Sequence, residues 1–409
     1  MITCRSSKRS SSKPAFTLVE LLVSIVIIGI IGGMVSQALT GANQQAKRNR
    51  AEAYINQLNL MVMQMYEEES RRIPFAPVSL RQNTLDDARA SKSRSLAILN
   101  WQRDYLRCVF PGQPLDLRRP PIDVGYPAYR DTGLRPVRID PLEDSSTLSA
   151  WNAALYENSL RHVARVKYQR RVEALVGQKA GIAGLSFNAC VDGDLNNGEW
   201  TTEHEGAECL YLILASNLFN GSPGIDALKS DDLGDTDDDG VPEVLDPWGR
   251  PVGFARWAPG YFLRQNWEPD SSLTSLTDEE LHLLKGDLAK DPIDLLLSDP
   301  RYAGVTGIPN FQADDPFPLV PIVVSAGSDG VFDMVGFDAP LNPAIDYANT
   351  PLSSMPADTG TLTFPAGLRF VDPYLLGVAV NDQFGAVRDT DEQGFDNSGD
   401  NVLPSLPIR

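Results

Sequence analysis

The chain is poor in the residues that most catalytic and zinc-binding motifs require. Its 409 residues include four cysteines and three histidines. The cysteines show no C-x-x-C or Cys/His spacing of the kind that binds zinc. The histidines, His162, His204 and His282, are isolated and lie in no nucleophile motif. Phosphate-binding loops and dinucleotide fingerprints are also absent. We therefore expect that the protein is not an enzyme.

Basic residues are also outnumbered by acidic ones. The chain has 36 Lys and Arg against 54 Asp and Glu, which gives a net charge of −18. So acidic a body is not expected to bind nucleic acid, and it suits metal cations and solubility outside the cytoplasm. The first 15 residues differ, since they contain Arg5, Lys8, Arg9 and Lys13 and no acid. A basic segment before a membrane helix favours a cytoplasmic N-terminus, so the bulk of the chain is expected to be exported.

The chain contains one long hydrophobic run, which extends from Leu21 to Leu39. An apolar segment of about 20 residues is long enough to span a bilayer as a helix. A helix also satisfies its own backbone hydrogen bonds, which lipid requires. The sequence therefore predicts a single membrane-spanning helix over about residues 16–39.

The helix is predicted to continue to about residue 72, where Pro74 follows. Its second half is amphipathic, which predicts packing on a globular domain. The apolar positions are Ala51, Tyr54, Ile55, Leu58, Met61, Val62, Met65 and Tyr66. A methionine-rich binding surface around Met61, Met63 and Met65 is the alternative interpretation.

The start of this helix resembles a known signal. Lys13-Pro-Ala15 followed by Phe16-Thr-Leu-Val-Glu20 is similar to the class III signal of type IV pilins and type II secretion pseudopilins. The resemblance implies that prepilin peptidase cuts between Ala15 and Phe16 and N-methylates Phe16. It also implies assembly with other pilin or pseudopilin subunits at an inner-membrane platform. Two positions depart from the family, since Ala15 replaces the usual Gly and Gln37 replaces a frequent Pro.

Three other interpretations of the apolar run stay open. An ordinary secretory signal would be cleaved after Ser36-Gln-Ala38. An uncleaved signal anchor would have no role in assembly. The buried helix of a soluble protein is the third, although the run is long and uniformly apolar for that role.

Glu20 has a predicted role that follows from its position at the head of the apolar run. A carboxylate in an apolar membrane helix is costly and normally has a partner. In a filament of parallel helices, the amino group of Phe16 in a neighbouring subunit is the obvious partner. The hypothesis is that this pair sets the register of the subunits.

A stretch of closely spaced acids from Asp235 to Asp246 has the spacing of a calcium loop, with Gly240 at the sixth position where a tight turn is needed. The predicted ligands are Asp235, Asp237, Asp239, the carbonyl of Val241, Glu243 and Asp246. The closing ligand is usually a bidentate Glu, and Asp246 is shorter. A solvated acidic turn is the alternative. A weaker second loop consists of Asp192, Asp194, Asn196 and Glu203, and it lacks the glycine.

The resemblance extends to two short segments. Asp246-Pro-Trp-Gly-Arg-Pro-Val252 is similar to the D-P-W-G-x-P segment of the major pseudopilin of type II secretion. Ser325-Ala-Gly-Ser-Asp-Gly330 is similar to that family's S-x-G-x-D-G segment, which lies beside a calcium-binding loop. This likeness implies a ligand at Asp329, with Asp333 and Asp338 as further candidates after it. An ordinary turn between strands is the alternative.

Cys190 and Cys209 bracket a polar loop, so the sequence predicts either a disulfide in an oxidising compartment or two buried free thiols. Elsewhere the pattern predicts helices and short strands. The expected helices cover residues 95–110, 149–176 and 277–285, and residues 208–215 form a short buried helix or strand. The expected strands cover residues 252–255, 319–325, 367–371 and 376–380.

Together these patterns predict an α+β, pilin-like fold, with a long N-terminal helix packed on a small antiparallel sheet that carries large helical and loop insertions. The expected parts are a leader (1–15), the helix (16–72), a helical insertion region (73–230) and a β-rich region (231–409). The expected function is a structural subunit of a type II secretion or type IV pilus-like filament. The alternative is a pilus-borne or membrane-anchored calcium-dependent binding module, which a ligand pocket in residues 73–230 would favour.

Overall fold

The computed structural model describes part of the chain. The described residues are 18–71, 99, 102–118, 160–191, 198–258, 261, 291, 293–294, 319–337, 350–351, 369–370, 385 and 401–404. The chain forms two compact units, Met1–Asn49 and Arg50–Arg409.

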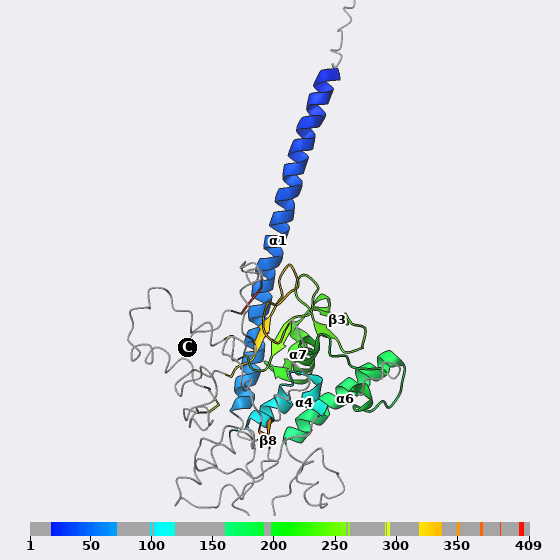
Figure 1. The fold of residues 1–409 in the computed structure, drawn as a ribbon, viewed down its shortest axis with the longest axis vertical. Coiled ribbons are helices and arrows are strands. Elements are labelled where there is room, and N and C mark those ends of the chain that lie inside the picture. The colour runs from blue at the N-terminus through cyan, green and yellow to red at the C-terminus, as the bar shows by residue number, and fades with distance from the viewer. Residues whose placement is uncertain are drawn as a thin grey trace, which may run out of the picture. The chain divides into compact units, whose positions relative to one another are not determined.

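Helix α1 (Leu18–Ser70) is one continuous helix of 53 residues (Figure 1). It ends close to the predicted position, and no proline interrupts it. Its apolar side chains from Leu18 to Leu39 are exposed. Within the described residues, α1 is the helix that is long and apolar enough to cross a membrane. The N-terminal unit therefore fits a single-pass membrane anchor.

The second half of α1 belongs to the core of the larger unit. The buried apolar residues on it are Ala51, Ile55, Leu58, Met61, Val62, Met65 and Tyr66. This confirms the predicted amphipathic face, and it places Met61 and Met65 in the core rather than on a binding surface. Tyr66 fixes the helix by two hydrogen bonds, because its hydroxyl donates to the Leu319 carbonyl at 2.8 Å and accepts from the Trp257 indole at 2.9 Å.

Helix α7 (Glu205–Ser216) is central to this core, with eight buried residues. It contacts β4 (Glu243–Val244), β5 (Gly253–Ala255) and the 3₁₀ turn η4 (Gly224–Ala227). The run at 208–215 is thus helical. Two further 3₁₀ turns are η3 (Ala189–Val191) and η5 (Ser230–Asp232).

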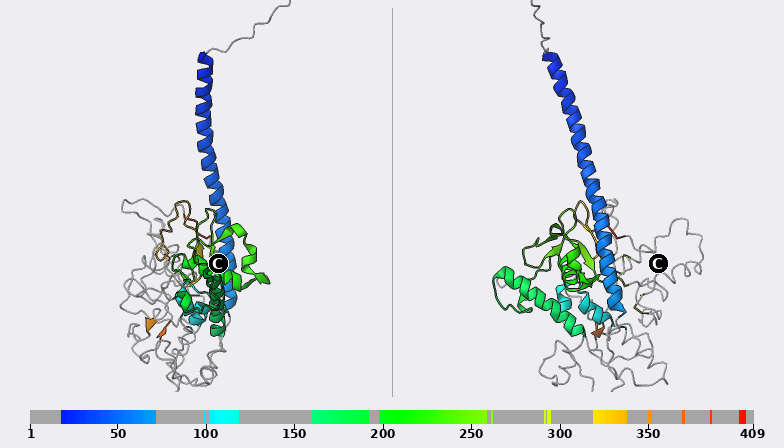
Figure 2. Two further views of the ribbon diagram at one scale, coloured as in Figure 1. Left: turned by 90° about the vertical axis from the view of Figure 1, so that its right-hand side faces the viewer. Right: turned by 180° about the vertical axis from the view of Figure 1, so that it is seen from behind.

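The other helices agree in part with the predicted ranges. Helix α6 (Leu160–Ala180) contacts the short α4 (Pro114–Arg118) and also α7. The right-hand view of Figure 2 shows α6 as a green helix near the cyan segment that includes α4. Residues 102–109 are helical too. The predicted helix at 277–285 and the predicted strand at 376–380 lie outside the described residues.

The described strands form four antiparallel pairs. The pairs are β1 (Leu218–Phe219) with β2 (Ser222–Pro223), β3 (Leu233–Gly234) with β4, β5 with β6 (Ile322–Val324), and β7 (Thr350–Pro351) with β8 (Arg369–Phe370). The β5–β6 pair is fully buried, and it confirms the strands predicted at 252–255 and 319–325. A long N-terminal helix followed by small antiparallel sheets agrees with the predicted α+β class.

Candidate metal centre and assembly helix

The residues expected to act in processing and assembly lie at the start of the chain. Ala15 and Phe16 are outside the described residues. Glu20 lies in the first turn of α1, with its side chain exposed among exposed apolar neighbours. One turn later, the Ser24 hydroxyl donates to the Glu20 backbone carbonyl at 2.6 Å. The serine is therefore satisfied within its own helix, and Glu20 lies one turn before it in the exposed apolar part of α1.

The Asp-Pro-Trp-Gly segment is a turn that the Asp246 carboxylate holds in place. Its Oδ1 accepts hydrogen bonds from the backbone N–H groups of Trp248 (2.8 Å) and Arg250 (3.1 Å). Gly249 has φ of +80°, a conformation that suits glycine. The other oxygen, Oδ2, accepts from the Ser325 hydroxyl at 2.7 Å. Asp246 thus stabilises a turn and connects it to the second family-like segment.

The two family-like segments contact each other at a further point. Arg250 donates from Nη1 to the Gly327 carbonyl at 3.1 Å. Gly330 has φ of +87°, and a Cβ there would lie 2.6 Å from the Arg250 guanidinium. A larger residue at 330 would displace that side chain. The segments at 246–252 and 325–330 therefore form one structural unit beside the β5–β6 pair.

Two other predicted ligands also hold the acidic loop in shape. Asp235 accepts from the Gly240 N–H at 3.2 Å and forms an ion pair with Lys179 at 3.2 Å. Both Glu243 oxygens lie 2.9 Å from the Thr236 N–H. Asp235, Glu243 and Asp246, three of the six predicted ligands, thus accept hydrogen bonds that hold turns of the backbone.

The structure brings Asp237 and Asp239 together with Glu208, which lies on α7. Oxygen atoms of these three carboxylates all lie within 4.8 Å of one another. Glu208 is 0% exposed, and the Trp200 indole donates to its Oε2 at 2.7 Å. Thr201 contacts both aspartates, by its N–H to Asp239 Oδ2 at 2.8 Å and by its hydroxyl to Asp237. We call Glu208, Asp237 and Asp239 the acidic cluster.

Burial raises the proton affinity of the acidic cluster. It raises the pKa of Glu208 to about 11, and the negative charge of Asp239 adds to this effect. Burial also raises the pKa of Asp239 to about 6, against hydrogen bonds from the Val241 and Thr201 N–H groups. Because a charge is costly to bury alone, this arrangement favours either a shared proton or a bound cation.

Glu208 was not among the residues predicted from spacing. It lies 29 positions before Asp237 in the sequence, outside any loop motif. The available signal was its place at the head of the apolar run Glu208-Cys-Leu-Tyr-Leu-Ile-Leu-Ala215. A buried carboxylate on such an apolar helix normally pairs with a charge or a metal.

The remaining predicted ligands are not part of the acidic cluster in the described part of the chain. Asp329 accepts from the Val331 N–H at 2.9 Å, and Asp333 has φ of +48°. Glu203 is exposed, 3.8 Å from the His204 imidazole. The other candidates, Asp192, Asp194, Asn196 and Asp338, lie outside the described residues.

The structure holds Cys190, Cys209 and Cys108 as buried thiols rather than in a disulfide. Cys190 lies in η3 and Cys209 in α7, and both pack into the same hydrophobic core. The disulfide interpretation is thus replaced by its alternative, in which these cysteines serve as small apolar core residues.

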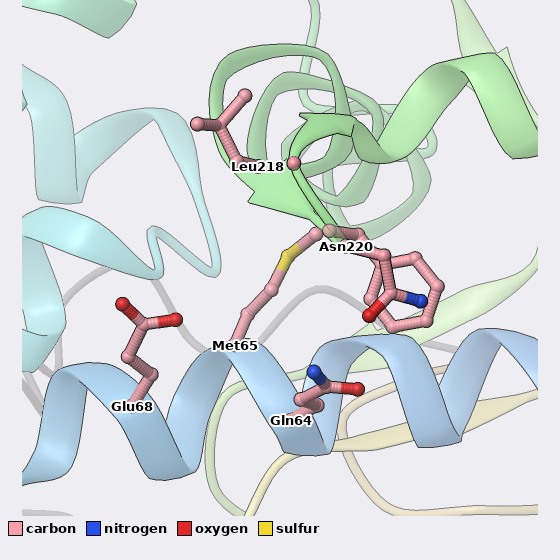
Figure 3. A pocket seen from close by; sticks show the side chains of 7 residues that line it. Gln64, Met65, Glu68, Leu218 and Asn220 are labelled. Atoms are coloured by element: carbon pink, nitrogen blue, oxygen red, sulfur yellow. The ribbon is translucent and has the colours of Figure 1, made fainter.

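A surface pocket of about 340 Å³ lies between α1 and the turn that joins β1 to β2. Figure 3 shows Met65 reaching from α1 toward this turn, with Gln64 and Glu68 beside it on the helix. The lining residues are Gln64, Met65, Glu68, Leu218, Phe219, Asn220 and Gly221. One carboxylate among apolar and amide groups does not identify a ligand class.

The first turn of α7 provides a prediction about pH. Burial, with a contribution from Asp116, raises the pKa of Glu205 from 4.5 to about 7. Between the pKa of the unfolded chain, 4.5, and that of the folded chain, about 7, the folded chain holds a proton that the unfolded chain has lost. The free energy of unfolding therefore falls as the pH rises through this range. We expect Glu205→Gln to gain about 2 kcal/mol relative to wild type between about pH 4 and pH 8.

This effect is measured by urea unfolding of the full chain in mild detergent with a chelator present. Glu203→Gln is the control, because its side chain is 71% exposed. A difference between wild type and Glu205→Gln that stays constant with pH would contradict the prediction.

Comparison with known proteins identifies the start of the chain. Residues 11–36 match the prokaryotic N-terminal methylation motif. This motif is the prepilin-type signal of type IV pilin-like proteins, and it implies processing by prepilin peptidase and assembly with other pilin subunits. It includes the Ala15–Phe16 bond and Glu20, so the resemblance inferred from these residues is confirmed. Searches of curated proteins and of solved structures return no match to this chain.

Proposed function

We propose that this chain is a structural subunit of a type II secretion or type IV pilus-like filament, cut between Ala15 and Phe16 and assembled through α1. The observation that carries the proposal is the methylation motif at residues 11–36, which runs directly into a 53-residue helix. The exposed apolar part of that helix has two roles, as a membrane anchor before assembly and as a stalk afterwards. The function is mechanical and needs no catalytic centre.

Charge supports the direction of export. The leader is basic, whereas the whole chain has a net charge of −18. A basic flank is normally retained on the cytoplasmic side of a membrane helix, which supports export of the acidic globular part to the opposite side. We propose that the protein is single-pass in the inner membrane, with its bulk in the periplasm or in an extracytoplasmic filament.

Glu20 and the new N-terminus form the proposed assembly contact. Cleavage before Phe16 creates a positive amino group four residues from Glu20. Residues four positions apart lie on the same face of a helix, so both charges can be presented together to a neighbouring subunit. Pairing between neighbouring subunits neutralises both charges, and it fixes the axial offset of one helix against the next.

The test is mass spectrometry of the N-terminus of the protein recovered from membranes of its native host. We expect a chain that begins with N-methylated Phe16. A chain that begins at Leu39 would instead show an ordinary secreted protein, and an intact Met1 would show a membrane-anchored domain without assembly. A strain without prepilin peptidase is the control, and it should yield the intact leader.

A further inference from the structure

The acidic cluster carries more negative charge than the surrounding protein compensates. Its three carboxylates approach within 4.8 Å, and Glu208 and Asp239 are 0% and 6% exposed. Lys179 pairs with Asp235 and Asp238 instead. In the described part of the chain, no lysine or arginine forms an ion pair with a cluster member. Since an uncompensated buried charge costs several kcal/mol, a counter-ion or protons are required.

Two oxygen atoms of the cluster have no hydrogen-bond donor among the residues that the structure describes. Glu208 Oε1 and Asp237 Oδ1 are buried and accept no hydrogen bond. The second oxygen of each is occupied, in Glu208 by the Trp200 indole and in Asp237 by the Thr201 hydroxyl. Unsatisfied buried acceptors are rare and often mark an ion. Here the hydrogen bonds to one oxygen of each carboxylate hold its side chain in place. The other oxygen, which accepts no hydrogen bond, is available to a ligand.

We propose that Glu208, Asp237 and Asp239 bind one calcium ion. All three donors are hard oxygen atoms, which suit calcium or magnesium rather than zinc. Magnesium requires near-ideal octahedral geometry and gives up its waters reluctantly, whereas calcium accepts irregular sets of carboxylates. A buried set of three carboxylates from two separate segments therefore favours calcium.

The bound ion would connect elements that are distant in the sequence. Glu208 lies on α7, and the two aspartates lie in the loop between β3 and β4. The same loop already contacts α6 through Lys179. Calcium thus fastens this loop to the central helix of the core. This inference is independent of the filament proposal, because it concerns the stability of the globular unit.

The experiment measures thermal unfolding of the full chain in mild detergent, after removal of metals with EDTA, with and without CaCl₂. At about 100 times the dissociation constant we expect the Tm of wild type to rise by about 5 °C. Glu208→Gln should show a rise of less than about 1 °C. Glutamine keeps the size of the side chain and still accepts the Trp200 hydrogen bond, so the fold is retained.

Asp238→Asn is the matched control. It removes one charge from the same loop, but Asp238 is 82% exposed in its side chain and pairs with Lys179. Its φ of +64° is one that asparagine tolerates. We expect this variant to keep the full calcium-dependent rise in Tm.

Asp237→Asn and calorimetric titration with CaCl₂ provide a second route if Glu208→Gln fails to fold. Asp237→Asn should weaken the measured affinity at least about tenfold. The proposal would be overturned if the Tm of the wild type did not rise with calcium and titration showed no binding. It would also be overturned if both Glu208→Gln and Asp237→Asn kept the full rise in Tm. An equal rise in MgCl₂ would overturn the assignment to calcium.

Discussion

Glu20→Ala should leave the protein in the membrane and lower its recovery in filaments by at least about tenfold. The physical reason is that the Phe16 amino group of a neighbouring subunit loses its counter-charge in an apolar environment. Truncating one partner of a buried charge pair costs about 2–5 kcal/mol. The membrane anchor itself becomes more apolar, so insertion is not impaired.

This result is measured as the ratio of sheared filament fraction to membrane fraction by immunoblot in the native host. Ser24→Ala is the control, because it removes a polar group one turn further along α1. The Ser24 hydroxyl bonds only its own helix in the described residues. Equal recovery of Glu20→Ala and wild type in filaments would refute the pairing hypothesis.

Asp104→Ala should destabilise the globular unit by about 3–5 kcal/mol. Asp104 and Arg107 are both 0% exposed in the helical segment 102–109. Arg107 donates from Nε and Nη2 to Asp104 Oδ1 at 3.1 and 2.8 Å, and from Nη1 to the Asp116 carbonyl at 2.8 Å. Removing the carboxylate leaves a buried guanidinium without its nearest counter-charge.

Urea unfolding followed by tryptophan fluorescence provides the measurement. The double variant Asp104→Leu/Arg107→Met should lose much less stability than Asp104→Ala, because no buried charge is left alone. Glu67→Ala is the surface control, since its partner Arg71 is 76% exposed, and we expect a change of about 0.5 kcal/mol or less. A loss below about 1 kcal/mol for Asp104→Ala would contradict the prediction.

The parts of the fold that the sequence predicts well depend on local pattern. The exposed apolar run and the buried face of α1 follow from composition and from a 3.6-residue period. Seven of the eight residues predicted for that face are buried, and the eighth, Tyr54, is partly buried. The strands at 253–255 and 322–324 also follow from short apolar runs between turn residues.

The acidic cluster is harder to predict, because the directions of the side chains determine which carboxylates come together. The spacing from Asp235 to Asp246 suits a calcium loop, and it equally suits a series of carboxylates that cap backbone N–H groups. In the structure Asp246 and Glu243 cap turns, whereas Asp237 and Asp239 face α7. The third member, Glu208, lies on α7, and its position beside this loop depends on tertiary packing. A short stretch of sequence does not reveal that packing.

The register of β5 and β6 has a consequence for how the globular unit folds. Ala255 lies opposite Ile322, so this buried pair joins two segments that are far apart in the sequence. Bringing distant segments together costs chain entropy before any contact is gained. Folds that depend on such pairings form slowly. We therefore expect formation of the β5–β6 pair to be a slow step in the folding of the globular unit.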